Sequence, residues 1–174
     1  MRKKQIIKMR QTKINEYFNN KQPINSSIIQ LKVDYNNQER KNNNKYLLRF
    51  DGASKGNPGK AGAGAVIYLN NNEIWNSSKY IGNNYTCNYA EYFALIIGLE
   101  EANYRNIKNL DVEGDSLLVI NQLNGKFNVK SLNIIELYRK AKELSNLFDS
   151  ITFKHIYRNH NKRADELANL LINK

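Results

Sequence analysis

The stretch Tyr46–Gly59, YLLRFDGASKGNPG, joins an apolar strand pattern to a glycine-rich segment. Its first six residues, Tyr46–Asp51, predict a buried strand, and the glycine-rich part, Gly52–Gly59, predicts a turn directly after it. Asp51 therefore ends a buried strand, where an acidic side chain is unexpected.

Downstream of the turn, strand and helix patterns alternate. Strands are expected at Gly62–Leu69 and Glu73–Tyr80, joined as a hairpin at the Asn70-Asn71-Asn72 tip. A helix that is apolar on nearly every side is expected at Asn88–Tyr104. A strand at Leu110–Gly114 and a helix at Asp115–Asn124, closed by Gly125, are expected next. A second helix follows, marked by apolar residues at helical spacing: Ile134, Tyr138, Ala141, Leu144 and Phe148. The chain then continues with a strand at Ile151–Arg158 and a last helix, marked by Ala164, Leu167, Ala168 and Leu171.

This order predicts an α/β fold. An antiparallel meander continued by crossover units gives a mixed sheet with helices on its faces. Asn133 and Glu136 predict a capping box for the helix that begins near them. Asn161 is the expected N-cap of the last helix.

Residues 1–45 and 46–174 differ in composition. The first segment carries eleven basic and three acidic side chains, and residues 35–45 are almost purely polar, so we expect a flexible basic tail followed by one domain. The tail holds most of the net charge of +11, which favours a polyanionic partner such as nucleic acid. Solubility or an AT-rich genome is the alternative explanation for this charge.

Two absences in the sequence narrow the function classes. No apolar run approaches the roughly 20 residues of a membrane helix, so no membrane association is expected. Cys87 is the only cysteine, which excludes a disulfide framework and a cysteine-based metal site. A reducing, intracellular location is therefore expected, and nuclear, cytoplasmic and viral replication sites all fit the sequence.

Four acidic residues occupy unexpected positions. Asp51 and Asp115 each end a predicted strand, where ligands commonly bind. Glu91 lies inside the most apolar helix with no basic residue within a turn, and Asp165 lies in the first turns of the last helix. Three have ordinary structural explanations: a turn residue for Asp51, a helix cap for Asp115, and a partner of the helix dipole for Asp165. A buried carboxylate such as that of Glu91 is costly unless it is paired or binds a metal.

Convergence of these four carboxylates would create a site for hard cations such as Mg²⁺, which prefer oxygen ligands. Two such ions about 4 Å apart can activate a water molecule and stabilise the leaving oxygen of a phosphodiester. The residues alone do not establish that the four side chains converge.

Four segments resemble type 1 ribonuclease H in their order and spacing. They are Phe50–Gly59 (FDGASKGNPG), Asn88–Glu91 (NYAE), Gly114–Ser116 (GDS) and Arg158–Asp165 (RNHNKRAD). The resemblance covers about residues 46–173 and implies the ribonuclease H-like fold, a five-stranded mixed sheet with helices on both faces. It also implies that two Mg²⁺ ions, or Mn²⁺ as a substitute, are held by Asp51, Glu91, Asp115 and Asp165.

The activity that this resemblance implies is endonucleolytic hydrolysis of the RNA strand of an RNA/DNA hybrid by a monomer. Water would attack the phosphate in line and leave 5′-phosphate and 3′-hydroxyl ends, for example during removal of RNA primers in DNA replication. The family positions that bind substrate correspond here to Gly52, Asn57, Thr86, Asn88 and Arg158.

The expected roles of the substrate-binding residues differ. Gly52 would let the backbone approach the RNA strand, Asn57 and Thr86 match phosphate or groove contacts, and Asn88 matches an amide in the minor groove. The structural alternatives are a turn residue for Asn57 and a helix N-cap for Thr86 or Asn88.

The sequence departs from the family pattern in three places. Gly125 leads almost directly to the next helix, so the lysine-rich protrusion of some bacterial members is missing, as in the compact archaeal-type subgroup. The loop that often carries a histidine before the last aspartate is short, and Arg158 or His160 would assist product departure or proton transfer instead. The alternative for His160 is an ordinary loop residue. Cys87 replaces an asparagine that is common at this position of the family and contacts the groove of the substrate, so this contact is not carried over to the chain. His155, in the predicted strand before this loop, is expected to be structural.

Within the tail, Gln11–Phe18 (QTKINEYF) is similar to the peptide that binds the sliding clamp, proliferating cell nuclear antigen (PCNA). One helical turn would place Ile14, Tyr17 and Phe18 on a single face, ready for an apolar pocket, while Gln11 would fill a polar one. A chance amphipathic turn and an organellar presequence are the alternatives.

Three alternative functions are also compatible with the sequence. They are a nuclease of the same fold with broader substrates including double-stranded RNA, a noncatalytic hybrid-binding module, and a clamp-associated adaptor. The four carboxylates argue against the binding module, because binding a polyanion would favour their removal.

Overall fold

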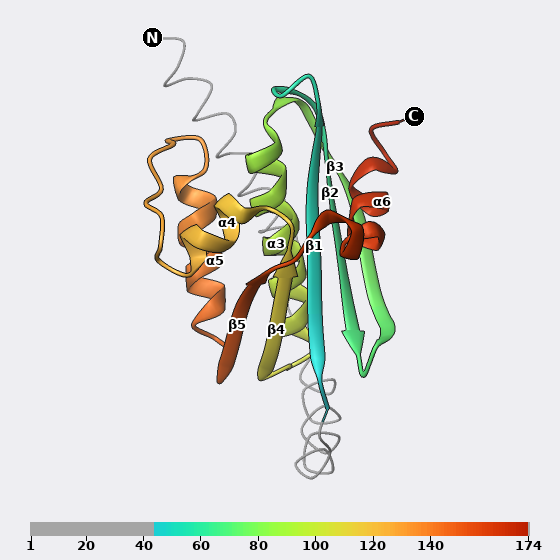
Figure 1. Ribbon diagram of the computed structural model, residues 1–174, viewed down its shortest axis with the longest axis vertical. Coiled ribbons are helices and arrows are strands. Elements are labelled where there is room, and N and C mark those ends of the chain that lie inside the picture. The colour runs from blue at the N-terminus through green and yellow to red at the C-terminus, as the bar shows by residue number, and fades with distance from the viewer. Residues whose placement is uncertain (1–43, 174) are drawn as a thin grey trace. The chain divides into compact units, whose positions relative to one another are not determined.

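Five strands form one mixed sheet in the order β3-β2-β1-β4-β5 (Figure 1). The computed structural model describes residues 44–173. The antiparallel meander consists of β1 (Tyr46–Lys55), β2 (Gly59–Leu69) and β3 (Asn72–Tyr85), and β4 (Asn109–Gly114) runs parallel to both β1 and β5 (Ser150–His155). The predicted five-stranded mixed sheet is thereby confirmed.

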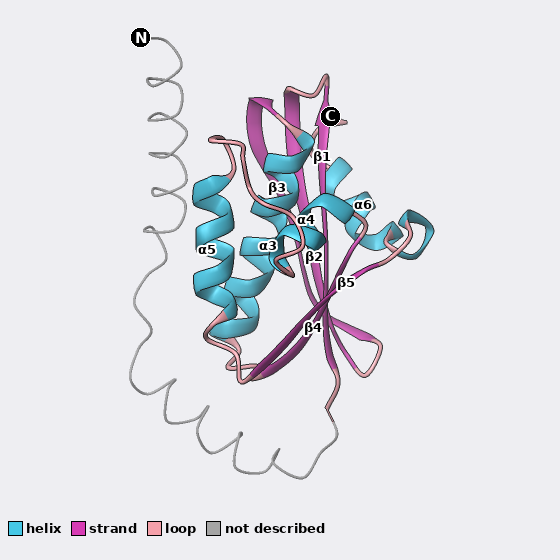
Figure 2. Ribbon diagram, turned by 60° about the vertical axis from the view of Figure 1, so that its left-hand side comes forward, coloured by secondary structure: helices cyan, strands magenta, loops and turns pink. Residues whose placement is uncertain are grey.

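Helices cover both faces of this sheet, as the α/β prediction required (Figure 2). On one face α3 (Cys87–Tyr104) packs against β1 and β2, and it also contacts α4 (Leu117–Leu123) and α5 (Ile135–Ser145). On the other face α6 (Lys162–Asn169) packs against β1 and β2, after the short 3₁₀ turn η1 (Arg158–His160).

The core divides between the two faces of the sheet. Leu48 of β1 packs against α3 at Gly98, where any side chain on the helix would overlap the leucine. Val66 of β2 faces the other way and forms a buried cluster with Ala164 and Leu167 of α6. Since α3 has buried residues on all sides, the prediction of an apolar helix enclosed by the fold is confirmed.

The predicted hairpin between β2 and β3 is also confirmed. Asn70 and Asn71 have φ angles of 50° and 70°, the left-handed conformation that tight hairpin turns require and that asparagine tolerates. The Asn70 backbone N–H donates to the Lys45 carbonyl at 3.0 Å, which ties this tip to the start of β1.

The glycine-rich turn is shorter than predicted. Antiparallel pairing continues through Lys55 and Lys60, so most of the segment Gly52–Gly59 belongs to strands and not to a loop. The reversal itself uses positive φ angles at Gly56 (103°) and Asn57 (26°). Asp51 is consequently an interior residue of β1 and not its last one.

Other predicted boundaries were wrong by a few residues or in their capping. The capping box is absent, because α5 begins after Ile134 without a side-chain cap, and Glu136 forms an ion pair with Arg139 instead. Asp115 precedes α4 and is not part of it, and β5 ends at His155, before Arg158. Leu171 lies beyond the end of α6.

Two further predictions concern association with other structures. Among the described residues, no helix combines the length and the apolar character needed to cross a bilayer. The predicted clamp-binding peptide, with Gln11, Ile14, Tyr17 and Phe18, lies outside the described residues.

Candidate active site

Three of the four predicted carboxylates meet at one place. Asp51 comes from β1, Glu91 from α3, and Asp115 directly follows β4; one oxygen from each lies within 4.8 Å of the others. Asp51 and Glu91 are buried, with 5% and 8% of their surfaces exposed. We refer to Asp51, Glu91 and Asp115 as the carboxylate cluster.

The approach of α3 to β1 depends on Gly52. A Cβ atom at this position would overlap the backbone of Ala90 and Glu91, so only glycine lets the helix bring Glu91 beside Asp51. This packing accounts for the glycine without any substrate contact. The predicted approach of Gly52 to an RNA strand stays a prediction.

A second glycine brings α6 close to the same strands. Gly64 pairs with Asp51 in the β1–β2 register, and a Cβ atom on it would overlap the backbone of α6 at Ala164 and Ala168. Both helices that carry predicted site residues thus rest directly on the sheet beside Asp51.

Burial and mutual repulsion make the ionised cluster unfavourable. Burial, followed by the charges of Asp115 and Asp165, raises the pKa of Asp51 to about 7, although the Gly52 N–H and Arg158 oppose this rise. Burial, followed by the charges of Asp51 and Asp115, raises the pKa of Glu91 well above its ordinary value. The positive charge of Arg158 is thus too weak to offset the burial and the mutual repulsion of these carboxylates.

The donor set fits a hard divalent cation. All three groups of the cluster offer only carboxylate oxygens, which Mg²⁺ and Mn²⁺ accept readily. The Glu91 Oε2 atom is buried and has no hydrogen-bond partner among the described residues. An unsatisfied buried carboxylate oxygen beside two other carboxylates is explained by a cation that it would bind.

Asp165, the fourth predicted carboxylate, is near the cluster but not part of it. Its Oδ1 accepts a hydrogen bond from the Arg158 guanidinium at 2.6 Å, within an ion pair whose arginine side chain is 75% exposed. Its charge nevertheless contributes to the raised pKa of Asp51. Arg158 thus pairs with a predicted metal ligand.

Asn161 has a role that the sequence interpretation missed. It occupies the predicted N-cap position of α6, but its side chain makes no capping hydrogen bond. Its Nδ2 donates instead to Asp115 Oδ1 at 2.7 Å and to the Phe50 carbonyl at 2.9 Å. The only sequence signal, an asparagine just before a helix, is equally typical of an ordinary cap.

Three of the predicted substrate-binding residues gather at the start of α3. Thr86 is the N-cap, its hydroxyl accepting from the Tyr89 N–H at 3.3 Å, so the structural alternative for this residue is confirmed. Asn57 Oδ1 accepts from the Cys87 N–H at 2.8 Å, and Asn88 is exposed in the first turn. The exposed side chains of Asn57 and Asn88 are accessible to a ligand at the start of α3.

His160 is exposed in η1, and no described residue forms a hydrogen bond or an ion pair with its imidazole. Its backbone carbonyl accepts from Arg49 at 2.9 Å, which fixes the η1 backbone to β1. The connection between α4 and α5, residues 124–134, contains no helix, in agreement with the missing lysine-rich protrusion.

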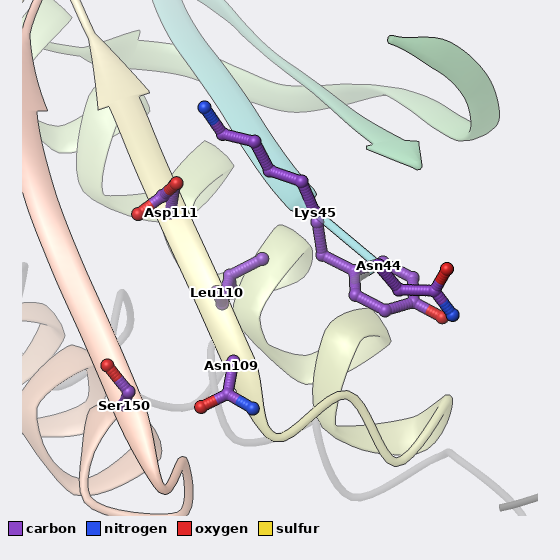
Figure 3. A pocket seen from close by; sticks show the side chains of 7 residues that line it. Asn44, Lys45, Asn109, Leu110, Asp111 and Ser150 are labelled. Carbon is purple, nitrogen blue, oxygen red and sulfur yellow. The ribbon is translucent and has the colours of Figure 1, made fainter. Parts of the chain in front are cut away.

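A cavity of about 300 Å³ lies at the other end of the parallel strands (Figure 3). It is lined by the beginnings of β1, β4 and β5, namely Asn44, Lys45, Tyr46, Asn109, Leu110, Asp111 and Ser150. Asp111 accepts a hydrogen bond from the Thr152 hydroxyl at 2.6 Å and is far along β4 from Asp115. This cavity contains none of the predicted site residues.

Comparison with protein families and curated sequences gives a consistent result. A family model described as reverse transcriptase-like matches residues 49–171. Ribonuclease HI of Halobacterium salinarum is 38% identical over 120 residues, which are 69% of this chain and 60% of that protein. The bifunctional protein Rv2228c of Mycobacterium tuberculosis is 37% identical over 126 residues, and the chain spans only 35% of its length.

Solved structures show the same similarity in three dimensions. The crystal structure of RNase H1 from Halobacterium salinarum matches with a TM-score of 0.71 and 36% identity, over 74% of this chain and 98% of that one. LC11-RNase H1 in complex with an RNA/DNA hybrid matches with a TM-score of 0.68 and 37% identity, over 72% of this chain and 95% of that one.

Proposed function

Because the chain belongs to the type 1 ribonuclease H proteins of the reverse transcriptase-like family, we propose that it hydrolyses the RNA strand of RNA/DNA hybrids. The observation that carries this proposal is the carboxylate cluster, with its unpartnered Glu91 oxygen, at the end of β4. The relative solved with an RNA/DNA hybrid supports the choice of substrate.

The proposed cofactor is a pair of Mg²⁺ ions, for which Mn²⁺ would substitute. Asp51, Glu91 and Asp115 would hold them together with Asp165, once Asp165 is released from Arg158. When bound, such ions supply an activated water and stabilise the charge of the leaving oxygen.

The protein's own side chains would bind and orient the substrate. Arg158, released from Asp165, presents an exposed guanidinium suited to a phosphate oxygen. Asn57, Thr86 and Asn88 would contact the hybrid at the start of α3 through neutral hydrogen-bonding groups. His160 would assist proton transfer or product departure, because its imidazole is exposed and its ring nitrogens can donate or accept a proton.

The proposed reaction is in-line hydrolysis. Water adds to phosphorus, the bond to the 3′ oxygen breaks, and that oxygen takes up a proton. The products carry a 5′-phosphate and a 3′-hydroxyl.

A cleavage assay tests the proposed activity. The full chain in Mg²⁺ should cut the labelled RNA strand of a hybrid internally, leaving 3′ ends that a polymerase can extend. Matched double-stranded RNA and single-stranded RNA should be cut far more slowly. Equal cutting of double-stranded RNA would favour the broader nuclease, and binding of the hybrid without cleavage in Mg²⁺ or Mn²⁺ would favour the binding module.

We also propose that the tail delivers the enzyme, as a monomer, to a sliding clamp at intracellular replication sites. The support is the Gln11–Phe18 peptide and its two aromatic residues. Replacing Ile14, Tyr17 and Phe18 by alanine should abolish binding to immobilised PCNA, while hybrid cleavage is unchanged. Asn15→Ala, in the same peptide, is the control; binding that survives the triple replacement would refute clamp recognition by this peptide.

A further inference from the structure

Asn161 connects three of the elements that carry the predicted metal ligands. Its Nδ2 donates to Asp115 Oδ1 at 2.7 Å and to the carbonyl of Phe50, the residue before Asp51, at 2.9 Å. Its own backbone carbonyl accepts from the Asp165 N–H at 3.1 Å, in the first turn of α6. One residue thereby links the end of β4, the middle of β1 and the start of α6.

The orientation of the Asn161 amide is fixed by these contacts. An amide nitrogen has two hydrogens, and each is used by a different acceptor. A flipped amide would place Oδ1 against two acceptor oxygens, which is repulsive. The side chain therefore holds Asp115 in one position, and it does so with a neutral donor that brings no positive charge to compete with a cation.

Folding alone does not account for an asparagine at this position. Asn161 is only 1% exposed, and its Oδ1 has no hydrogen-bond partner among the described residues, which is a cost to stability. It also forgoes the capping hydrogen bond that makes asparagine favourable before a helix. The contacts that it does make serve the placement of Asp115 and α6.

We propose that Asn161 is a positioning residue of the divalent-cation site. It orients Asp115 toward Asp51 and Glu91, and it fixes the start of α6, which carries Asp165, against β1. The inference rests on the proposed function to the extent that a cation is expected at the carboxylate cluster. Residues that hold metal ligands in place typically change metal affinity by 10- to 100-fold when they are replaced.

Mn²⁺ titration calorimetry of the full chain without nucleic acid tests this proposal. Asn161→Ala should weaken Mn²⁺ binding by about tenfold or more. The matched control is Asn169→Ala, which removes a hydrogen bond of 2.9 Å from Asn169 Nδ2 to the Asp165 carbonyl within the same helix. This control should bind Mn²⁺ within about twofold of the unaltered protein, because it leaves Asp115 untouched.

Titration well below each variant's unfolding midpoint separates positioning from stability. A residue that only stabilises the fold would lower the unfolding midpoint in EDTA and leave the Mn²⁺ affinity of the folded protein unchanged. If Asn161→Ala does not fold, Asn161→Ser replaces it, since serine is an accepted N-cap but is too short to reach both acceptors. The same loss of affinity is expected for this variant.

The outcomes distinguish the inference from the proposed function. Mn²⁺ affinity of the folded Asn161 variant within twofold of the unaltered protein would overturn the positioning role alone. Absence of Mn²⁺ binding by the unaltered protein would overturn the cation site and the inference together. Weakened Mn²⁺ binding in the variant, with no hybrid cleavage by the unaltered protein, would support the inference and refute the proposed function.

Discussion

At the scale of single residues, the carboxylate cluster opposes folding as long as no cation is bound. The rise in the pKa of Asp51 from 3.8 to about 7 represents roughly 4 kcal/mol of unfavourable environment for its ionised form. Asp51→Asn removes this charge and should therefore stabilise the metal-free protein at pH 8 by up to about 4 kcal/mol, measured by urea unfolding in EDTA. Asp111→Asn, on the same sheet but outside the cluster, should give no gain; a destabilised Asp51→Asn would contradict this account.

The same pKa values predict how metal-free stability depends on pH. The folded protein holds protons on Asp51 and Glu91 more tightly than the unfolded chain does, so its stability falls as pH rises from about 4 toward 7. The midpoint of urea unfolding in EDTA should therefore decrease between about pH 4 and 7, and this decrease should be smaller in Asp51→Asn. A midpoint that rises over this interval in EDTA would show that the cluster is not destabilising when ionised.

Local sequence context was sufficient to single out the carboxylates but not their arrangement. Glu91 stood out because an acid inside an apolar helix needs a partner, and the structure buries it as expected. The position of Asp165 was not predictable in the same way, because its ion pair with Arg158 depends on the path of η1. Asn161 was expected only as a helix N-cap, because its contacts with the Phe50 carbonyl and Asp115 join segments that are distant in sequence.

For the packing of helices and strands, replacing two glycines by alanine should lower the free energy of unfolding by different amounts. Gly52→Ala forces a Cβ atom into the α3 backbone, so it should cost about 3 kcal/mol or more and weaken Mn²⁺ binding by separating Glu91 from Asp51. Gly125→Ala meets no atom within 4 Å but has a φ of +74°, so strain alone should cost about 1 kcal/mol. Urea unfolding of both variants measures the difference; equal losses would refute the close approach of α3.

The sequence predicted which segments are helices and strands more accurately than the residues at which they begin and end. The apolar pattern of α3 and the Asn70-Asn71 turn are local signals, and both were interpreted correctly. The strands around Gly56 ran further than expected because cross-strand pairing, which is not local, keeps glycines extended. The capping box is absent because α5 begins one residue later than expected, so that Ile134 and not Asn133 is its N-cap.

At the scale of the whole molecule, the unequal charge of tail and domain predicts a salt effect. Residues 1–45 carry a net charge of +8, so replacing Lys3, Lys4 and Lys8 by glutamine should weaken hybrid binding at low salt. The slope of log affinity against log salt should become shallower, measured in an Asp51→Asn background that prevents cleavage. An unchanged slope would show that these lysines make no phosphate contact.

Residue patterns alone did not predict that carboxylates from distant segments of the chain would lie close together. Resemblance to a family supplied it, and the structure places Asp51, Glu91 and Asp115 together across β1, α3 and the end of β4. Sheet order and register determine this meeting, and both depend on pairing between segments that are far apart in the chain.

A comparison of hybrid cleavage in Mg²⁺ by the unaltered chain and by Asp51→Asn tests whether the carboxylate cluster is catalytic, with Asp111→Asn as the matched control. If the carboxylate cluster performs the chemistry, the unaltered chain and Asp111→Asn should cut the RNA strand at similar rates. Asp51→Asn should be slower by at least about a thousandfold while remaining folded. Cleavage by Asp51→Asn at a rate near that of the unaltered chain would show that the carboxylate cluster does not perform the chemistry.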